Sequence, residues 1–321
     1  MIHLVASHPH YRDHLQPIWD SLPASEKGYE IFGEERKVIP NHEIILVAGY
    51  SEINRFPRNR VIYVEHGAGQ SYVGLTAAVK PYYSGGPQHR NTLGFICPNE
   101  EVEARWRTAY PSKPSAVVGC PRLDPWHRGD RGHCEPRTVA ITFHWDAQFT
   151  GVPETASAFP HYLPYLREAI VAWNQKGWHV IGHAHPRYPA LAAFWKLPEI
   201  RDLGVEFVES SDGVLDRATV LVADNTSLQA EFLSLGRPVV WLNSPAYRKE
   251  VSHGGRFWKW PQYGGPTIDN PASLAELDLD GLQVPTGHPY AYADGLASQR
   301  AADFIVELVT PPHQILSGPV V

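Results

Sequence analysis

The sequence predicts an α/β protein with two doubly wound, Rossmann-like domains, and three observations support this prediction. Short apolar runs rich in Val, Ile and Leu, typical of buried strands, alternate with helical periodicity along most of the chain. A stretch rich in proline, glycine and charge, residues 121–137, separates two such series. Residues 293–309 then carry the pattern of one more helix.

The first series, residues 1–120, predicts an amino-terminal domain. Its strands are expected near 2–6, 44–48, 61–65, 93–97 and 115–119, with helices between them. Strands that alternate with helices are typical of a parallel sheet covered on both faces. We therefore expect the carboxyl ends of these strands to carry ligand-binding residues.

The second series, residues 138–292, predicts a domain of the same kind. Its strands are expected near 138–143, 178–182, 205–208, 219–223 and 238–242, with a long helix near 161–176. Residues 252–292 are rich in glycine, proline and aromatic residues, which favours irregular loops. We expect residues 121–137 to be a linker, and 293–309 to be a closing helix that packs back on the amino-terminal domain.

Composition limits the function. The 321 residues are 43% apolar and 19% charged, which is ordinary for a soluble globular chain. Three scattered cysteines, Cys97, Cys120 and Cys134, favour a reducing cytoplasm over a disulfide framework. Because the sequence contains no CxxC pair, we do not expect a zinc site built from cysteines. The sequence contains no run of 18 apolar residues, so it predicts no membrane-spanning helix. The net charge of −6, without a basic run, argues against tight nonspecific nucleic-acid binding.

The segment 219–242 is the most informative part of the chain. It reads as a strand, a turn of Asp224 and Asn225, a helix, a glycine stop at Gly236 and another strand. Thr226 and Gln229 have the spacing of a capping box at the helix start. A helix that begins directly after a strand offers backbone amides to an anion, which favours a nucleotide diphosphate.

A carboxylate follows this predicted anion site. Ser227 and Glu231 are four residues apart, so we expect them to share one face of the helix. A carboxylate one turn beyond the phosphates is well placed to accept ribose hydroxyls. The plain alternative is an ordinary strand–helix–strand unit with a capped helix.

Two histidines follow predicted strands in different domains. His66 follows the strand near 61–65 and is itself followed by glycines, which let a ligand approach the backbone. His185 follows the strand near 178–182, together with Arg187. Histidine can accept or donate a proton near neutral pH, and arginine can bind a phosphate with its planar fork. His144, after the first strand of the second domain, would lie near the donor phosphates.

These residues belong to four motifs that occur in a recognisable order. The motifs are His66–Ala68, Gly119–Asp124, His185 with Pro186, and Asp224–Ser227 with Glu231 and Leu235–Pro238. The chain thereby resembles the CDP-glycerol glycerophosphotransferase family, the cytoplasmic enzymes of teichoic-acid synthesis, over roughly residues 60–245. Departures from the family pattern are Ala68, Asn225, Thr226 and Glu231, and Gly69–Tyr72 stand where basic residues usually follow.

The resemblance implies a GT-B fold, in which two Rossmann-like domains face a cleft. It implies a transferase that moves a glycerol-phosphate or glycosyl group from a nucleotide-activated donor to an acceptor hydroxyl. The donor would be CDP-glycerol or a UDP- or GDP-sugar, and the acceptor a polymer, a glycolipid or a nucleic-acid base. No separate cofactor is expected, and the oligomeric state is left open.

Each candidate residue has an expected role. His66 would be the general base, and His185 would stabilise the phosphate or the leaving group. The expected donor-binding residues are Asp224, Asn225, Thr226, Ser227, Glu231, His144 and Arg187. The expected acceptor-side residues are Gly67, Gly69, Gln70 and His8. Because no paired acidic motif follows a strand, we expect activity without a metal ion.

Three alternatives remain open from the sequence. The first is a phage-type glycosyltransferase that acts on modified DNA bases. The second is an enzyme like UDP-sugar 2-epimerases, which would need carboxylates for proton transfer, and Glu65, Asp124 and Asp146 are the candidates. The third is a protein that binds a nucleotide without turnover.

Overall fold

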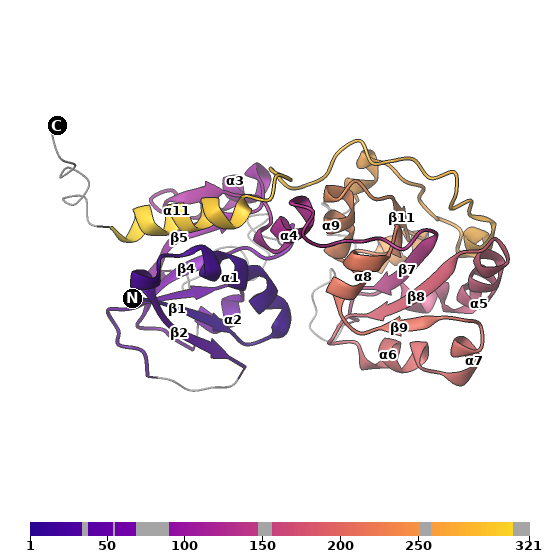
Figure 1. Cartoon of the computed structure of the whole chain (residues 1–321), viewed down its shortest axis with the longest axis horizontal. Coiled ribbons are helices and arrows are strands. Elements are labelled where there is room, and N and C mark those ends of the chain that lie inside the picture. Colours follow the sequence, from indigo (N-terminus) through magenta and orange to yellow (C-terminus); the bar gives the residue numbers. More distant parts are fainter. Residues whose placement is uncertain (34–37, 54, 69–89, 147–155, 251–257, 311–321) are drawn as a thin grey trace. The chain divides into compact units, whose positions relative to one another are not determined.

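The computed structural model describes residues 1–33, 38–53, 55–68, 90–146, 156–250 and 258–310. The chain divides into two compact units, and Figure 1 shows a parallel sheet with flanking helices in each. The first unit contains Met1–Arg128 and Tyr290–Val321, and the second contains Gly129–Pro289. No helix within the described ranges is both long and apolar enough to cross a membrane.

The first unit contains six parallel strands in the order β2-β1-β3-β4-β5-β6. They are β1 (Ile2–Ala6), β2 (Lys27–Phe32), β3 (Ile44–Val47), β4 (Arg60–Val64), β5 (Thr92–Cys97) and β6 (Ser115–Val117). Strand β2 was not predicted. It lies at the sheet edge and buries only Ile31, so its sequence lacks the apolar run that marks the central strands.

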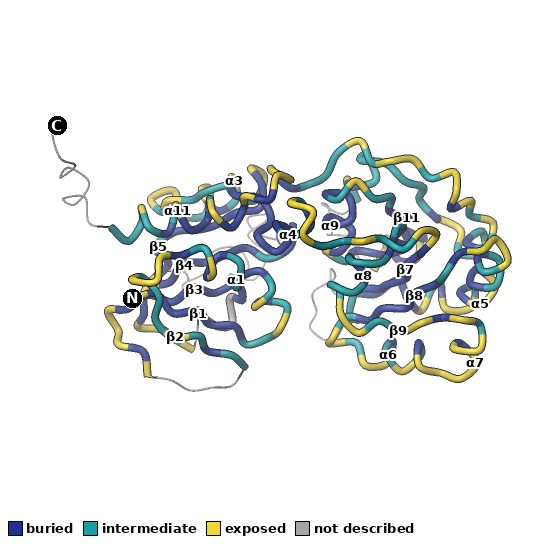
Figure 2. The backbone as a smooth tube through the Cα atoms, viewed as in Figure 1, coloured by how far each residue is buried: buried dark blue, intermediate teal, exposed yellow. Residues whose placement is uncertain are grey.

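Helices cover both faces of this sheet. Helices α1 (Pro9–Ser21) and α11 (Ala297–Val309) pack on one face, where Leu15 and Ile305 join the apolar core. Helices α2 (Tyr50–Ile53) and α3 (Glu100–Ala109) lie on the other, where Trp106 stacks on Phe95. Figure 2 shows the central strands of this sheet as buried, whereas edge strand β2 is mostly half-buried.

Residue Asp124 explains why the carboxyl-terminal helix belongs to the first unit. The backbone amides of Ala297 and Ser298 donate to its carboxylate at 3.0 and 2.7 Å. Asp124 therefore caps α11 from a distant part of the sequence, where the helix has no side-chain cap of its own. The expected linker starts with helical turns, namely the 3₁₀ turn η3 (Pro121–Leu123) and α4 (Asp124–His127), and this part lies in the first unit.

The second unit contains five parallel strands in the order β11-β10-β7-β8-β9. They are β7 (Thr138–Phe143), β8 (His179–Ala184), β9 (Glu206–Val208), β10 (Val220–Ala223) and β11 (Val239–Trp241). The surrounding helices are α5 (Phe159–Gln175), α6 (Pro189–Trp195), α7 (Pro198–Arg201), α8 (Ser211–Arg217), α9 (Leu228–Ser234) and α10 (Pro245–Glu250).

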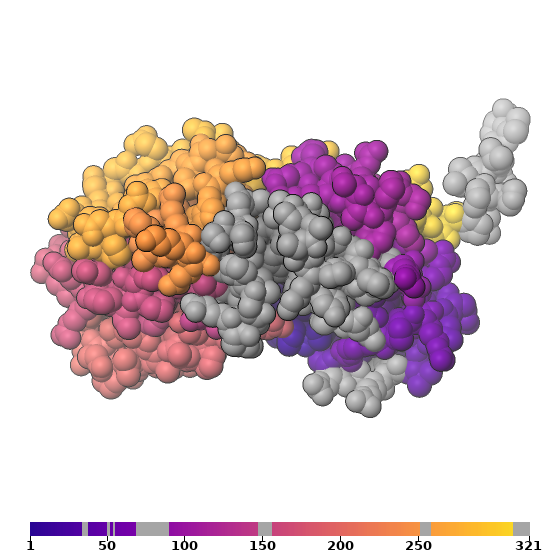
Figure 3. Space-filling model, turned by 180° about the vertical axis from the view of Figure 1, so that it is seen from behind, coloured from indigo at the N-terminus to yellow at the C-terminus, as the bar shows by residue number. Residues whose placement is uncertain are grey.

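The segment after β11 forms an outer layer of the second unit. It contains the 3₁₀ turns η6 (Trp260–Tyr263) and η7 (Pro271–Glu276), and its orange surface covers part of the face in Figure 3. Ile268 and Leu274 pack into the core beneath it, together with Trp173 of α5. These apolar contacts hold the segment together with backbone hydrogen bonds that join Trp241 of β11 to Pro266 and Ile268.

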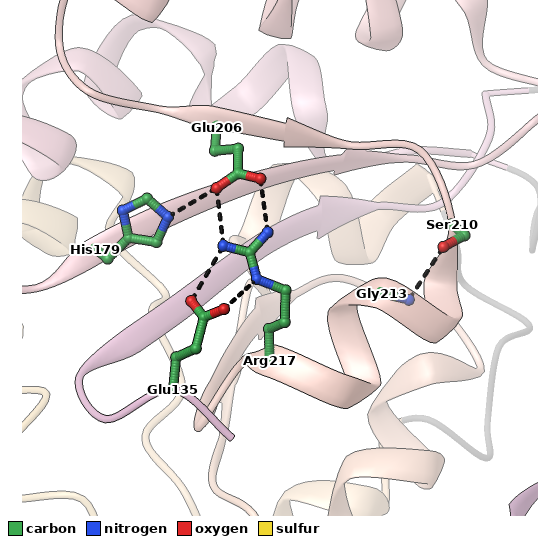
Figure 4. Close-up of polar contacts among 6 residues, drawn as sticks. All are labelled: Glu135, His179, Glu206, Ser210, Gly213 and Arg217. Carbon is green, nitrogen blue, oxygen red and sulfur yellow. Dashed lines mark hydrogen bonds and ion pairs between the residues drawn. The ribbon is translucent and has the colours of Figure 1, made fainter. Parts of the chain in front are cut away.

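Ion pairs join the amino ends of three strands in this unit, as Figure 4 shows. The guanidinium of Arg217 donates to Glu135 at 2.6 Å and to Glu206 at 2.6 Å. His179, the first residue of β8, lies 3.2 Å from the second oxygen of Glu206. This edge lies opposite the carboxyl ends of the strands, so the network supports the fold at a distance from the candidate site.

Candidate functional site

Strand order places a switch point in each unit. In the second sheet, successive strands run outward from β7 to β9, and the chain then returns to β10 on the other side of β7. In the first sheet, the same reversal lies between β1 and β3. Doubly wound proteins bind ligands outside the carboxyl ends of the strands at such a point.

At the switch point of the second unit, Asp224 joins three segments. Its carboxylate accepts from the His144 amide at 2.6 Å, from the Ala158 amide at 2.8 Å and from the Ser157 hydroxyl at 3.4 Å. The side chain is fully buried, and burial raises the pKa of Asp224 to about 7. Asp224 thus ties the ends of β10 and β7 to the start of α5.

Next to this point, two predicted residues lie side by side. Phe143 and Ala184 are paired in the register of β7 and β8, so the residues that follow them, His144 and His185, are neighbours. Their ring centroids are 6.0 Å apart. The fold therefore brings together two histidines that are 41 residues apart in the sequence.

An aromatic side chain joins this pair to Arg187. The indole of Trp145 stacks on the His185 ring, with centroids 6.0 Å apart, and the Arg187 guanidinium lies 5.2 Å from the indole centroid. The Arg187 amide also donates to His185 Nδ1 at 3.1 Å. His144, His185 and Arg187 thus form one cluster at the carboxyl ends of β7 and β8, and the sequence analysis did not identify Trp145 as its centre.

Helix α9 differs from its prediction at its amino end. The expected capping box is absent, because the Gln229 side chain donates to the Ala223 carbonyl at 3.1 Å and the Thr226 amide donates to the Asp224 carbonyl. The last carbonyl of β10 therefore accepts two hydrogen bonds, one from the Gln229 side chain and one from the Leu242 amide at 2.9 Å. The predicted glycine stop is confirmed, since Gly236 has a φ of +69°.

The residues of this turn differ in exposure. Ser227 is exposed and Thr226 half-buried, whereas Asn225 and Glu231 are buried. Ser227 and Glu231 are one helical turn apart, as expected, since the Glu231 amide donates to the Ser227 carbonyl at 3.3 Å, but only Ser227 is exposed. Ser227 precedes the first residue of α9, and every residue of this helix is buried.

In the first unit, His66 follows β4 at the edge where the strands end. Its Nδ1 lies 3.0 Å from the Ala48 carbonyl oxygen, which follows β3. Because a carbonyl only accepts, Nδ1 carries the proton in the neutral ring and Nε2 carries the lone pair. The half-buried ring meets the Tyr11 ring edge-on, with centroids 5.0 Å apart.

Other histidines surround His66. His10 and His14 of α1 have ring centroids 6.3 Å from that of His66, and His8 stacks on His10 at 5.4 Å. The Gly67 amide donates to His14 Nε2 at 3.3 Å. Of the predicted acceptor-side residues, His8 and Gly67 therefore lie in this histidine cluster, while Gly69 and Gln70 lie outside the described residues.

The three carboxylates weighed for an epimerase have different surroundings. Glu65 is buried and accepts from the Trp106 indole at 3.1 Å, and Asp124 caps α11. Asp146 is half-buried and follows the β7 turn. Over the described ranges, no three His, Cys, Asp or Glu side chains come together in an arrangement that could hold a metal ion.

Two doubly wound parallel sheets in one chain, each with polar residues at its carboxyl edge, define an α/β protein of the GT-B type, as predicted. The chain is similar to the solved structure of the wall teichoic acid polymerase TagF, with a TM-score of 0.63 and 14% identity, covering 96% of this chain and 88% of TagF. A TagF histidine variant soaked with CDPG gives the same TM-score at 13% identity, covering 99% of this chain and 90% of TagF. The motif resemblance to teichoic-acid glycerophosphotransferases thus extends to the fold.

A sugar-nucleotide epimerase and a protein solved with UDP also share the fold. The UDP-GlcNAc 2-epimerase from Methanocaldococcus jannaschii has a TM-score of 0.55 at 12% identity and covers 95% of this chain and 99% of its own. MnaA from S. aureus, solved with UDP, has a TM-score of 0.53 at 14% identity, and the match covers 97% of this chain and 98% of MnaA. No family model matches the sequence, and no curated protein matches it.

Proposed function

We propose that this chain is a transferase that uses a nucleotide-activated donor, with CDP-glycerol as the first candidate. The observation that carries the proposal is the cluster of His144, His185 and Arg187 around Trp145 at the switch point of the second sheet. Imidazole and guanidinium groups at that place suit a diphosphate. The exposed Ser227 would add a hydroxyl to the same site.

In this proposal, His66 activates the acceptor hydroxyl. Its Nδ1 proton is engaged by Ala48, so Nε2 takes the proton of the attacking hydroxyl. With CDP-glycerol, the acceptor oxygen forms a bond to the phosphorus of the glycerol phosphate, and CMP leaves. His185 and Arg187 would stabilise the charge that develops on the leaving phosphate. With a sugar donor, the anomeric carbon would be attacked and a nucleoside diphosphate would leave.

The role of Asp224 in this proposal differs from the one expected from the sequence, whereas that of Glu231 is kept. Asp224 is buried behind the His144 turn, so it supports the donor site rather than touching the donor. Glu231 remains the proposed ribose ligand; it is as fully buried as Asp224, so this role requires donor binding to expose its carboxylate. We also propose a cytoplasmic location, which is supported by the small number of cysteines, three in 321 residues.

Ligand-induced stabilisation tests the proposal. The melting temperature is measured with CDP-glycerol, UDP-GlcNAc and a GDP-sugar, each with its free nucleotide as control. A ligand at one hundred times its Kd adds about 2.7 kcal/mol of stability, so the true donor should stand out. Phosphorus NMR then follows CMP release in the presence of polyol acceptors, with and without EDTA. Turnover in EDTA is expected, and loss of activity that Mg²⁺ restores would contradict metal independence.

An epimerase is the second candidate, favoured by the fold similarity to UDP-GlcNAc 2-epimerases. Two of its three candidate carboxylates, Glu65 and Asp124, already accept hydrogen bonds within the first unit. Incubation with UDP-GlcNAc in D₂O separates the two proposals, because epimerisation at carbon would incorporate deuterium. Tight binding without either reaction would instead support a non-catalytic nucleotide-binding protein.

A further inference from the structure

The turn His66–Gly67 has a second anchor that the sequence analysis did not identify. Gly67 has a φ of +60°, and its amide donates to His14 Nε2 at 3.3 Å. A backbone amide only donates, so Nε2 must accept, and the neutral His14 ring carries its proton on Nδ1. The anchor therefore exists only while His14 is uncharged.

The surroundings of His14 keep it uncharged. It lies on the buried side of α1 with 5% of its surface exposed. Burial lowers the pKa of His14 well below its ordinary value, and the Arg122 cation lowers it further. His66 and His10 are the other titratable groups that affect the pKa of His14, and both lower it.

Arg122 connects this anchor to a sequence motif. It lies in η3, inside the Gly119–Asp124 motif, and is itself buried. Asp124 of the same motif caps α11. The carboxylate of this motif thus caps α11, and its guanidinium helps to keep uncharged the His14 ring that accepts from Gly67.

We propose that His14 is a positioning residue for His66, because its Nε2 fixes the Gly67 amide and with it the peptide that carries the His66 ring. This inference rests on the proposed role of His66 as general base. The Ala48 carbonyl holds the ring at Nδ1, and His14 holds the backbone one residue further on. These two hydrogen bonds fix the direction in which Nε2 of His66 points before any substrate binds.

Nitrogen-15 NMR of the histidine rings tests the inference without a substrate. The full chain is compared with His14→Gln, whose amide oxygen replaces Nε2 as acceptor, and with His14→Leu, which removes the acceptor. His42→Leu, at an exposed position of the same unit, is the control. The wild type, the control and His14→Gln should show His66 as one tautomer with the proton on Nδ1. His14→Leu should show exchange between tautomers and a Gly67 amide that exchanges faster with solvent.

Turnover provides the second measurement. With the donor that the ligand screen identifies, His14→Leu should lower kcat by on the order of 10²-fold, the scale of a misplaced catalytic group, with KM for the donor unchanged. His14→Gln should recover most of this loss. Equal kcat in the two variants would overturn the positioning role.

The outcomes separate this inference from the proposed transferase. If no donor is turned over, the transferase proposal fails, and the His66 tautomer still decides the role of His14. An unchanged His66 spectrum in His14→Leu overturns the inference. If His14→Leu does not fold, His14→Asn, whose shorter amide does not reach Gly67, takes its place against His14→Gln under the same criterion.

Discussion

The carboxylate of Asp224 accepts a hydrogen bond of 2.6 Å from the backbone amide of His144, which ties the end of β10 to the end of β7 across the switch point of the second sheet. Because His144 contacts His185 and adjoins Trp145, this single bond fixes one side of the proposed donor site. Asp224 is therefore the residue through which the stability of the sheet edge and the geometry of the site are coupled.

The raised pKa of Asp224 predicts a pH dependence of stability. The pKa of Asp224 is about 7 in the folded protein, above its ordinary value of 3.8. The protonated side chain therefore stabilises the fold by the full amount below pH 3.8, and this stabilisation is lost as pH rises through 7. Asp224→Asn removes this titration. Its melting temperature should lie below that of the wild type at pH 5, and the gap should narrow by pH 8. Asp202→Asn, at an exposed position, is the control, and parallel curves for wild type and Asp224→Asn would contradict the prediction.

Replacing His66 should separate catalysis from donor binding. Loss of a general base lowers turnover by about 10² to 10⁴. His66→Ala should therefore lose kcat on this scale, while calorimetry shows the same donor affinity, because His66 lies in the first unit and the proposed donor cluster in the second. His42→Ala should keep full activity. Wild-type turnover in His66→Ala would remove His66 as the base.

Arg187 should contribute to donor affinity through its fixed guanidinium. A hydrogen bond to a charged group contributes about 1.5–3 kcal/mol, so Arg187→Ala should weaken donor binding by roughly 10- to 100-fold. Arg187→Lys should recover only part of this loss, since an ammonium lacks the planar fork that lies over Trp145. Calorimetry measures both, with the exposed Arg167→Ala of α5 as control. An affinity unchanged in Arg187→Ala would exclude this residue from the donor site.

How far the sequence could predict the fold depends on where each element lies. Central strands such as β4 and β7 are buried on both faces, so their apolar runs are visible in the sequence. Edge strand β2 buries only Ile31 and therefore leaves no such signal. Gly236 was predictable because the end of a helix is a local event that only a few residues decide.

The candidate site was less predictable, because its contacts join distant segments. The Gly67–His14 bond spans 53 residues and the Asp224–His144 bond spans 80. Strand-end position could identify His66 and His185, but not His14, which lies in the middle of an amphipathic helix. Gln229 fitted a local capping pattern, but its side chain instead donates to the Ala223 carbonyl at the end of β10.

Arg217 should stabilise the second unit in a pH-dependent manner. Hydrogen bonds from Arg217 lower the pKa of Glu206 to about 2. The ionised Glu206 side chain therefore stabilises the fold at pH values above its ordinary pKa of 4.5, and this stabilisation is lost as pH falls through 2. Arg217→Met should lower the melting temperature at pH 7, and the difference from wild type should shrink toward pH 3. Because both Glu partners are about half exposed, about 1 kcal/mol per pair is the upper limit. A difference that is as large at pH 3 as at pH 7 would assign the effect to packing of the arginine stem.

Glu231 requires a test that separates its two possible roles, a ribose ligand and a buried structural carboxylate. Its side chain is fully buried in α9, so Glu231→Ala should lower stability by about 1–3 kcal/mol, the cost of leaving former partners unsatisfied. Glu231→Gln keeps the size and one acceptor oxygen, and should unfold close to the wild type. If Glu231 binds ribose, Glu231→Gln should still weaken nucleotide binding, and a 2′,3′-dideoxy nucleotide should bind the wild type and Glu231→Gln equally. Glu231→Gln with wild-type affinity for the ribonucleotide would leave Glu231 as a structural residue of α9 alone.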